Sequence, residues 1–317
     1  MRNKAALLLL LLTLSLSARP QQRFAASNST SDTGLQALVN NAAHTALVKF
    51  ADKKLTEAQL SITLIDLRDV QHPATASFRG NERVYPASVV KLFYLGAVHR
   101  WLEDKKIEQT DELKRAVRDM IVDSSNEATQ YVVDVLTRTT GGFELPPKEM
   151  EEWQNKRDAV NRYYAALGFT NINVNQKTFC EDAYGREKVS RGPNGENRNK
   201  LTTDATARLL SEIVTGRAVT PARSGQMMEL LKRDFAGTSK DNDDQGHGFT
   251  GIALQGTGAK LWSKAGWTST TRHDAAYIEL PSGAKFVLVT FTTDHANERE
   301  IIPTVARVVI DGIASVK

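Results

Sequence analysis

Strand-like segments lie near both ends of the chain, and the residues between them have helical periodicity. Residues 60–69, LSITLIDLRD, alternate in polarity and are rich in β-branched side chains, which is typical of a strand. The segments 273–280 and 284–294 show a similar pattern on either side of a Pro281–Gly283 turn, and a further strand is expected at 259–266. The simplest architecture is therefore an α+β sandwich, in which both ends of the chain contribute to one antiparallel sheet.

Amphipathic helices are expected at both termini and throughout the middle of the chain. Residues 34–53 and 297–316 would flank the sheet. The other helical segments are 88–142 with a break near Ser124, 149–168, 201–216 and 222–234. The polar segment 169–200 is expected to be a long, functional or disordered loop. We expect one catalytic domain at 35–317, with a sheet lobe (35–87 and 217–317) and a helical lobe (88–216).

The N-terminus has the pattern of an export signal. Basic residues are followed by an apolar run from Ala5 to Leu16 and then by small residues, so we expect a signal peptide at 1–18 and a polar linker at 19–34. The apolar run is short for a membrane span, so no stable membrane insertion is expected after cleavage. The protein is expected to be secreted or periplasmic. Its single cysteine, Cys180, cannot form an internal disulfide, so stability must come from core packing.

Charge and histidine spacing narrow the classes of partner. The net charge is +4, and it is not concentrated in a Lys/Arg block, so a nucleic-acid partner is not expected. The six histidines are scattered without metal-ligand spacing, and we expect no metal and no cofactor. The stretch DNDDQGHG at 241–248 imitates the start of a calcium loop, but Ile252 stands where the closing glutamate is needed. We interpret it as a solvated acidic loop.

A serine and a lysine stand one helical turn apart at the start of an otherwise apolar helix. Ser88 and Lys91 share one helical face. The first turn of a helix favours negative charge on a serine oxygen, and an apolar wall pushes a lysine toward its neutral, proton-accepting form. Together the two residues have the properties of a nucleophile and its base.

Two further motifs follow in the chain. Ser124 and Asn126 form S-x-N at the expected helix break, and Lys264-Ala265-Gly266 lies on an expected strand. S-x-x-K, S-D-N and K-T-G together are the signature of class A β-lactamases and penicillin-binding proteins. The chain therefore resembles a class A β-lactamase-like serine hydrolase from about residue 35 to its C-terminus. The resemblance implies the fold of β-lactamases and transpeptidases.

The resemblance also implies a role for each matching residue. Ser88 would be the acylated nucleophile and Lys91 its base. Ser124 would relay a proton to the leaving nitrogen. Lys264 would lower the proton affinity of its neighbours and attract a substrate carboxylate.

The substrate-binding residues follow from the same resemblance. Asn126 would hold the substrate amide, and Ala265-Gly266 would complete the third motif. The backbone N–H groups of Ser88 and Trp267 would form the oxyanion hole. Arg272 and His273 either bind a substrate carboxylate or form an exposed turn pair. Of the two, Arg272 is the better carboxylate ligand, because a guanidinium can donate two parallel hydrogen bonds.

Four departures from the family pattern bear on deacylation and recognition. Ser125 replaces the aspartate of S-D-N, Ala265 removes the hydroxyl of K-T-G, and the connection from Ser88 to Ser124 is short. Thr178 stands where the deacylating glutamate is expected. Glu181 or Asp182, one turn further on, would substitute if the loop shifts, or both would be solvated loop acids.

These features predict an exported, monomeric serine hydrolase that opens a β-lactam amide through a Ser88 acyl-enzyme. One alternative is a D-alanyl-D-alanine peptidase or another cell-wall acyl hydrolase, whose substrate would resemble a peptidoglycan stem peptide. Another is a penicillin-recognising binding module that is acylated once and deacylates poorly.

Overall fold

The computed structural model describes residues 33–179 and 182–316. The predicted signal peptide, most of the predicted linker, Cys180 and Glu181 lie outside the described residues. Among the described helices, none is long and apolar enough to cross a membrane.

A single antiparallel sheet is the scaffold of the molecule. Its strand order is β2-β1-β6-β5-β4-β3, so the N-terminal strands lie beside the last strand of the chain. The strands are β1 (Leu60–Asp66), β2 (Ala74–Phe78), β3 (Lys232–Arg233), β4 (Lys260–Trp267), β5 (Thr271–Glu279) and β6 (Lys285–Thr293). The predicted α+β architecture, with a sheet built from both ends of the chain, is confirmed.

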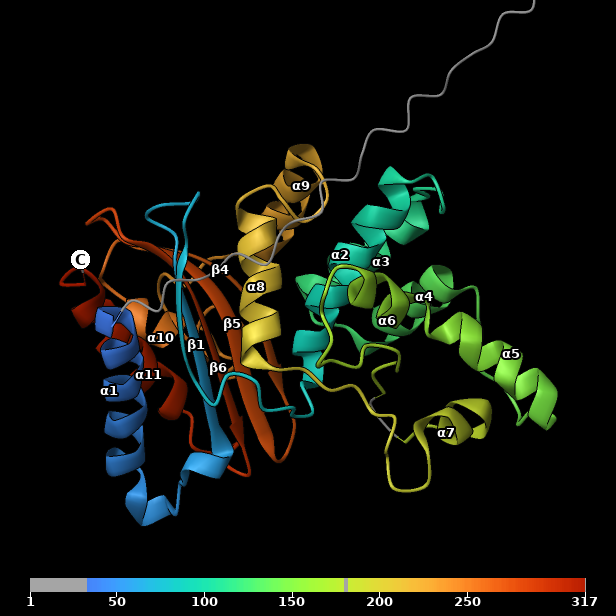
Figure 1. The fold of residues 1–317 in the computed structure, drawn as a ribbon, viewed down its shortest axis with the longest axis horizontal. Helices are drawn as coiled ribbons and strands as arrows, with labels where there is room; N and C mark the ends of the chain where they lie inside the picture. The colour runs from blue at the N-terminus through green and yellow to red at the C-terminus, as the bar shows by residue number, and fades with distance from the viewer. Residues whose placement is uncertain (1–32, 180–181, 317) are drawn as a thin grey trace, which may run out of the picture.

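Helices cover both faces of this sheet (Figure 1). The terminal helices α1 (Thr33–Lys49) and α11 (Ile301–Ile313) pack together on one face. On the other face α8 (Thr203–Val214) contacts β1, β5 and β6. β1 is buried along its whole length because both of its faces are covered.

The remaining helices form a second region beside α8 (Figure 1). They are α2 (Val90–Glu103), α3 (Asp111–Ile121), α4 (Asn126–Thr137), α5 (Pro147–Arg157), α6 (Ala159–Ala166), α7 (Gly185–Arg191) and α9 (Pro221–Leu231). The short helix α10 (Gly251–Leu254) is not part of this region and packs on α11. α2 is central: every residue from Val90 to His99 is buried, because α3, α4, α6, α8 and α9 surround it. An all-round buried helix must hide any polar side chain that it carries.

Two sequence expectations for this region were wrong in detail. The helix expected at 149–168 is two helices that meet at Asp158, whose carboxylate accepts hydrogen bonds from Gln154 and Asn175. The segment 169–200 contains α7 and is anchored by a backbone pair between Asn173 and Lys200. Asparagine side chains satisfy backbone groups along it, which a sequence pattern cannot reveal.

Candidate active site

Ser88 lies in a strained turn that leads into α2. The short 3₁₀ helix Ala87–Val89 precedes α2 directly, and Ala87 has a φ of 46°, in the left-handed region that alanine rarely adopts. Backbone strain of this kind is concentrated at functional sites. Ser88 is partly exposed, whereas its neighbours Ala87 and Val89 are buried. The turn thus holds one serine at the surface of an otherwise buried segment.

β4 passes directly against this turn. A Cβ placed on Gly266 would lie 2.7 Å from the backbone nitrogen of Ser88, 2.8 Å from that of Val89 and 2.9 Å from the Pro86 oxygen. Real Cβ atoms do not approach backbone atoms so closely, so only glycine fits here. Gly266 is therefore required for packing, because it allows the backbone of β4 to lie beside Ser88.

Lys91 is fully buried and points at the junction between α3 and α4. Its Nζ donates to the Ser124 carbonyl oxygen at 2.5 Å and to Asn126 Oδ1 at 2.9 Å, and it lies 3.3 Å from Ser124 Oγ. Ser124 has a φ of 55°, so the chain is again strained at this point. Ser125, which replaces the usual aspartate, caps α4 by accepting from the Ala128 N–H.

Lys264 reaches the same serine from the other side. It is also fully buried, and its Nζ donates to Ser124 Oγ at 3.0 Å, to Gln245 Oε1 at 2.7 Å and to the Ala265 carbonyl at 2.7 Å. Burial lowers the pKa of Lys264 well below its usual value, and the positive charge of Lys91 lowers it further. The Ser124 hydroxyl can accept from both lysines and still donate its own proton, because a hydroxyl has two lone pairs and one O–H.

The predicted carboxylate-binding pair is buried on β5 and is not an exposed turn pair. His273 accepts from the Thr292 N–H at Nδ1, so Nε2 carries the proton and donates to the Tyr85 carbonyl at 2.9 Å. Burial lowers the pKa of His273 to about 4, which keeps its imidazole neutral. His273 therefore supports the segment that precedes Ser88.

The Arg272 side chain is directed at the 241–248 loop. Its guanidinium donates to Asp243 Oδ1 at 2.8 Å and to the Gly248 carbonyl at 2.5 Å, and it stacks on the Phe249 ring at 4.0 Å. Arg299 Nη2 donates to the other oxygen of Asp243 at 3.2 Å. The loop is solvated only in part: Asp241 and Asn242 are exposed, whereas Gln245 is buried and Asp243 pairs with Arg272 and Arg299.

The structure describes two of the three residues considered for deacylation, Thr178 and Asp182. Thr178 is buried, and its hydroxyl has no hydrogen-bond partner within the described part of the chain. Asp182 is exposed and pairs with Arg191 at 2.5 Å. Glu181 lies outside the described residues.

Gln245 was missed by the sequence reasoning. Its Oε1 accepts from Lys264 Nζ and, at 3.1 Å, from the Ala265 N–H, while its Nε2 donates to the carbonyl oxygens of Ile121 and Val122. It therefore joins the end of α3 to β4. The sequence offered no signal that separates Gln245 from Asn242, the other amide side chain in this run of acids and glycines.

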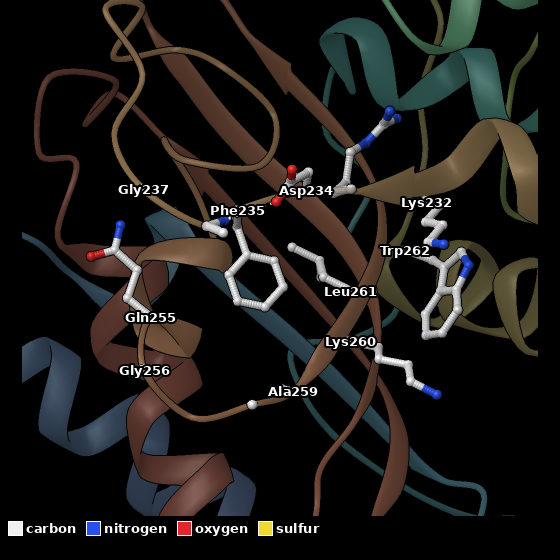
Figure 2. Close-up of a pocket in the computed structure, with 13 residues that line it drawn as sticks. Lys232, Asp234, Phe235, Gly237, Gln255, Gly256, Ala259, Lys260, Leu261 and Trp262 are labelled. Carbon is white, nitrogen blue, oxygen red and sulfur yellow. Dashed lines mark hydrogen bonds between the residues drawn. The ribbon is translucent and has the colours of Figure 1, made fainter.

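A pocket of about 440 Å³ lies away from this site and is lined in part by residues of β3 and β4. Figure 2 shows Lys232, Lys260 and Trp262 together on one side of it, with Gly237 and Gln255 on the other. None of the described site residues predicted from the sequence lines this pocket.

Known structures share this architecture. A β-lactamase from Sphaerobacter thermophilus matches at a TM-score of 0.63 and 19% identity, over 88% of this chain and 98% of that one. A β-lactamase from Chitinophaga pinensis matches at 0.64 and 16%, over 86% and 100%. The structure of PBP-A matches at 0.61 and 16%, over 88% and 97%. The fold is thus that of β-lactamases and penicillin-binding proteins.

Comparison with a family profile identifies the family of the chain. The profile of the β-lactamase enzyme family matches residues 112–313, which is more than half of the chain. The chain therefore belongs to the β-lactamase enzyme family and is a hydrolase of the β-lactamase and penicillin-binding type. The matched region includes Ser124 and Lys264 and begins after Ser88 and Lys91. No curated protein sequence matches the chain.

The close approach at Gly266 generates a stability prediction. Gly266→Ala forces backbone atoms around Ser88 to move, so we expect it to lower the free energy of unfolding by about 1–3 kcal/mol. The matched control is Gly225→Ala on the exposed side of α9, where nothing lies within 4 Å of the added Cβ. There alanine should stabilise by about 0.5–1 kcal/mol. Denaturant unfolding of both variants provides the measurement, and equal stability of Gly266→Ala and wild type would contradict the packing account.

Proposed function

We propose that the protein is an exported serine hydrolase that opens the amide of a β-lactam ring through an acyl-enzyme on Ser88. The observation that carries this proposal is the position of Ser124 Oγ, 3.3 Å from Lys91 Nζ and 3.0 Å from Lys264 Nζ. A hydroxyl between two buried amines, beside a strained turn that exposes one serine, provides a route for moving a proton. Acyl transfer from an amide needs such a route, because the leaving nitrogen must be protonated.

In the proposed acylation, Ser88 Oγ attacks the amide carbonyl and its proton passes to neutral Lys91. The proton then travels through the Ser124 hydroxyl to the leaving nitrogen, and the C–N bond breaks. Burial supports the neutral form of Lys91, since its side chain is 0% exposed.

The backbone beside Ser88 would stabilise the oxyanion. The Ser88 N–H, at the start of α2, and the Trp267 N–H, on β4, are the two proposed donors. The contact at Gly266, one residue before Trp267, supports this pairing because it holds β4 against the Ser88 turn. Asn126, the first residue of α4, would hold the substrate amide while its Oδ1 accepts from Lys91.

For deacylation, the described residues do not supply a carboxylate at the position where the family pattern places the general base. Thr178 has no carboxylate and cannot act as the general base that activates water. This observation favours a second candidate function, a cell-wall peptidase or a penicillin-recognising protein that retains its acyl group. The fold is shared with PBP-A, of which a variant has been solved as an acyl-enzyme complex with penicillin G.

The direct test is covalent labelling of Ser88. Intact-mass spectrometry after incubation with a penicillin should show one adduct, and peptide mapping should place it on Ser88. The adduct should persist for a measurable time after excess penicillin is removed, because Thr178 cannot activate the water that would hydrolyse it. Ser88→Ala should remain unlabelled.

Labelling of another residue, or no labelling across a broad panel of β-lactams, would contradict the proposed function. A wild-type adduct too short-lived to detect, together with rapid turnover, would show that an efficient base is present and would overturn the slow-deacylation part alone.

The role of Lys91 is tested by Lys91→Met. Methionine fills a similar volume without an amine, so the core should remain packed. We expect the rate of Ser88 acylation to fall by about 10²–10⁴-fold, as is typical when a general base is lost. The matched control is Lys188→Met on α7, an exposed site where the same substitution should leave the rate unchanged. If folded Lys91→Met is acylated at the wild-type rate, Lys91 is a structural residue.

A further inference from the structure

The 241–248 loop supplies oxygen atoms to the cationic groups that would recognise a substrate carboxylate. Two of its side chains take part: Gln245 faces Lys264 and β4, and Asp243 faces Arg272 and Arg299. The contacts of both side chains join the loop to residues that are distant from it in the sequence.

Gln245 engages the donors around Lys264. A lysine ammonium has three N–H donors. Those of Lys264 have three acceptors within hydrogen-bonding distance, namely Ser124 Oγ, Gln245 Oε1 and the Ala265 carbonyl. The Ala265 N–H also donates to Gln245, and Ala265 has no hydroxyl to offer. The polar groups of Lys264 and Ala265 therefore already form hydrogen bonds within the protein.

Asp243 neutralises the buried arginine. The Arg272 side chain is only 3% exposed, and its Nη1 lies 2.8 Å from Asp243 Oδ1. Arg299, the second partner of Asp243, is 40% exposed, so solvent screens much of its charge. A carboxylate that approached Arg272 would meet the carboxylate of Asp243 already in place.

The loop is packed too closely to act as a loose cover. A Cβ on Gly248 would lie 2.3 Å from the Asn242 carbonyl oxygen and 3.0 Å from that of Asp244, so only glycine allows the chain to fold back here. Asp244 closes the same turn by accepting from the His247 N–H at 2.9 Å. The positions of Asp243 and Gln245 are thus built into the loop.

We propose that Asp243 and Gln245 are specificity-determining residues that select acyl substrates with an uncharged group, an ester or amide, at the end of the site near Ala265 and Arg272. The inference rests on the proposed function, since it concerns the substrate of the same site. A free carboxylate at that end finds Lys264 Nζ and both Nη atoms of Arg272 already bonded within the protein, and it is repelled by Asp243. An uncharged group avoids both penalties.

The first test compares benzylpenicillin with its methyl ester as acylating agents of Ser88. In the wild type the methyl ester should acylate Ser88 faster than the free acid. Asp243→Asn leaves Arg272 and Arg299 without an anionic partner, so it should raise the acid-to-ester ratio by roughly ten- to a hundredfold, the effect of a charged hydrogen bond. Asp311→Asn, which removes an exposed charge on α11, should leave the ratio unchanged.

The second test does not need acylation. Equilibrium binding of both penicillins is measured in the Ser88→Ala background, with and without Asp243→Asn or Gln245→Ala. Either loop substitution should tighten binding of the free acid relative to the ester by roughly tenfold or more. An unchanged ratio in both variants, or no binding of the free acid to any variant, overturns the inference. Failure of the proposed function appears separately, as the absence of a Ser88 adduct in the wild type.

Discussion

The burial of two lysine side chains around one serine hydroxyl is the constraint on which the candidate site depends. Lys91 comes from α2 and Lys264 from β4, both are 0% exposed, and both reach Ser124 Oγ. A buried ammonium is unfavourable, and a second one nearby makes it more so. The pKa of Lys264 is lowered well below its ordinary value mainly by burial and then by Lys91. Lys264 therefore holds its proton weakly, which suits a group beside a proton relay.

The fold creates this arrangement at the boundary between the sheet and the helical region. Residues Val90 to His99 of α2 are all buried, so the Lys91 side chain is enclosed by neighbouring elements. Gly266 lets β4 approach the Ser88 turn, and the left-handed backbone of Ser124 turns the chain between α3 and α4. Gln245 then ties the end of α3 to β4. The contacts of Gly266 and Gln245 join segments that are far apart in the sequence, so the site exists only in the folded chain.

Much of the sheet was predictable from the sequence because its strands alternate in polarity and are bounded by turn residues. The two-residue strand β3 is too short to give such a pattern. The motifs grouped Lys91, Ser124 and Lys264, and the structure brings these three side chains within hydrogen-bonding distance. The same reasoning missed Gln245 and misread Asp243, because an acidic, glycine-containing segment is usually solvated. The ion pairs of Asp243 depend on Arg272 and Arg299, whose positions only the tertiary structure defines.

The central claim, that burial destabilises the charge of Lys264 beside Ser124, is tested most directly by NMR titration of the folded protein with ¹³C-labelled lysine. The resonance missing from Lys264→Arg should titrate well below the ordinary lysine pKa of 10.5. Lys200→Arg is needed as a second assignment variant, because partial burial also lowers the pKa of Lys200. If the Lys264 resonance titrates at or above 10.5, its ammonium is stabilised in the folded protein, and the account of a weakly held proton at Ser124 is wrong.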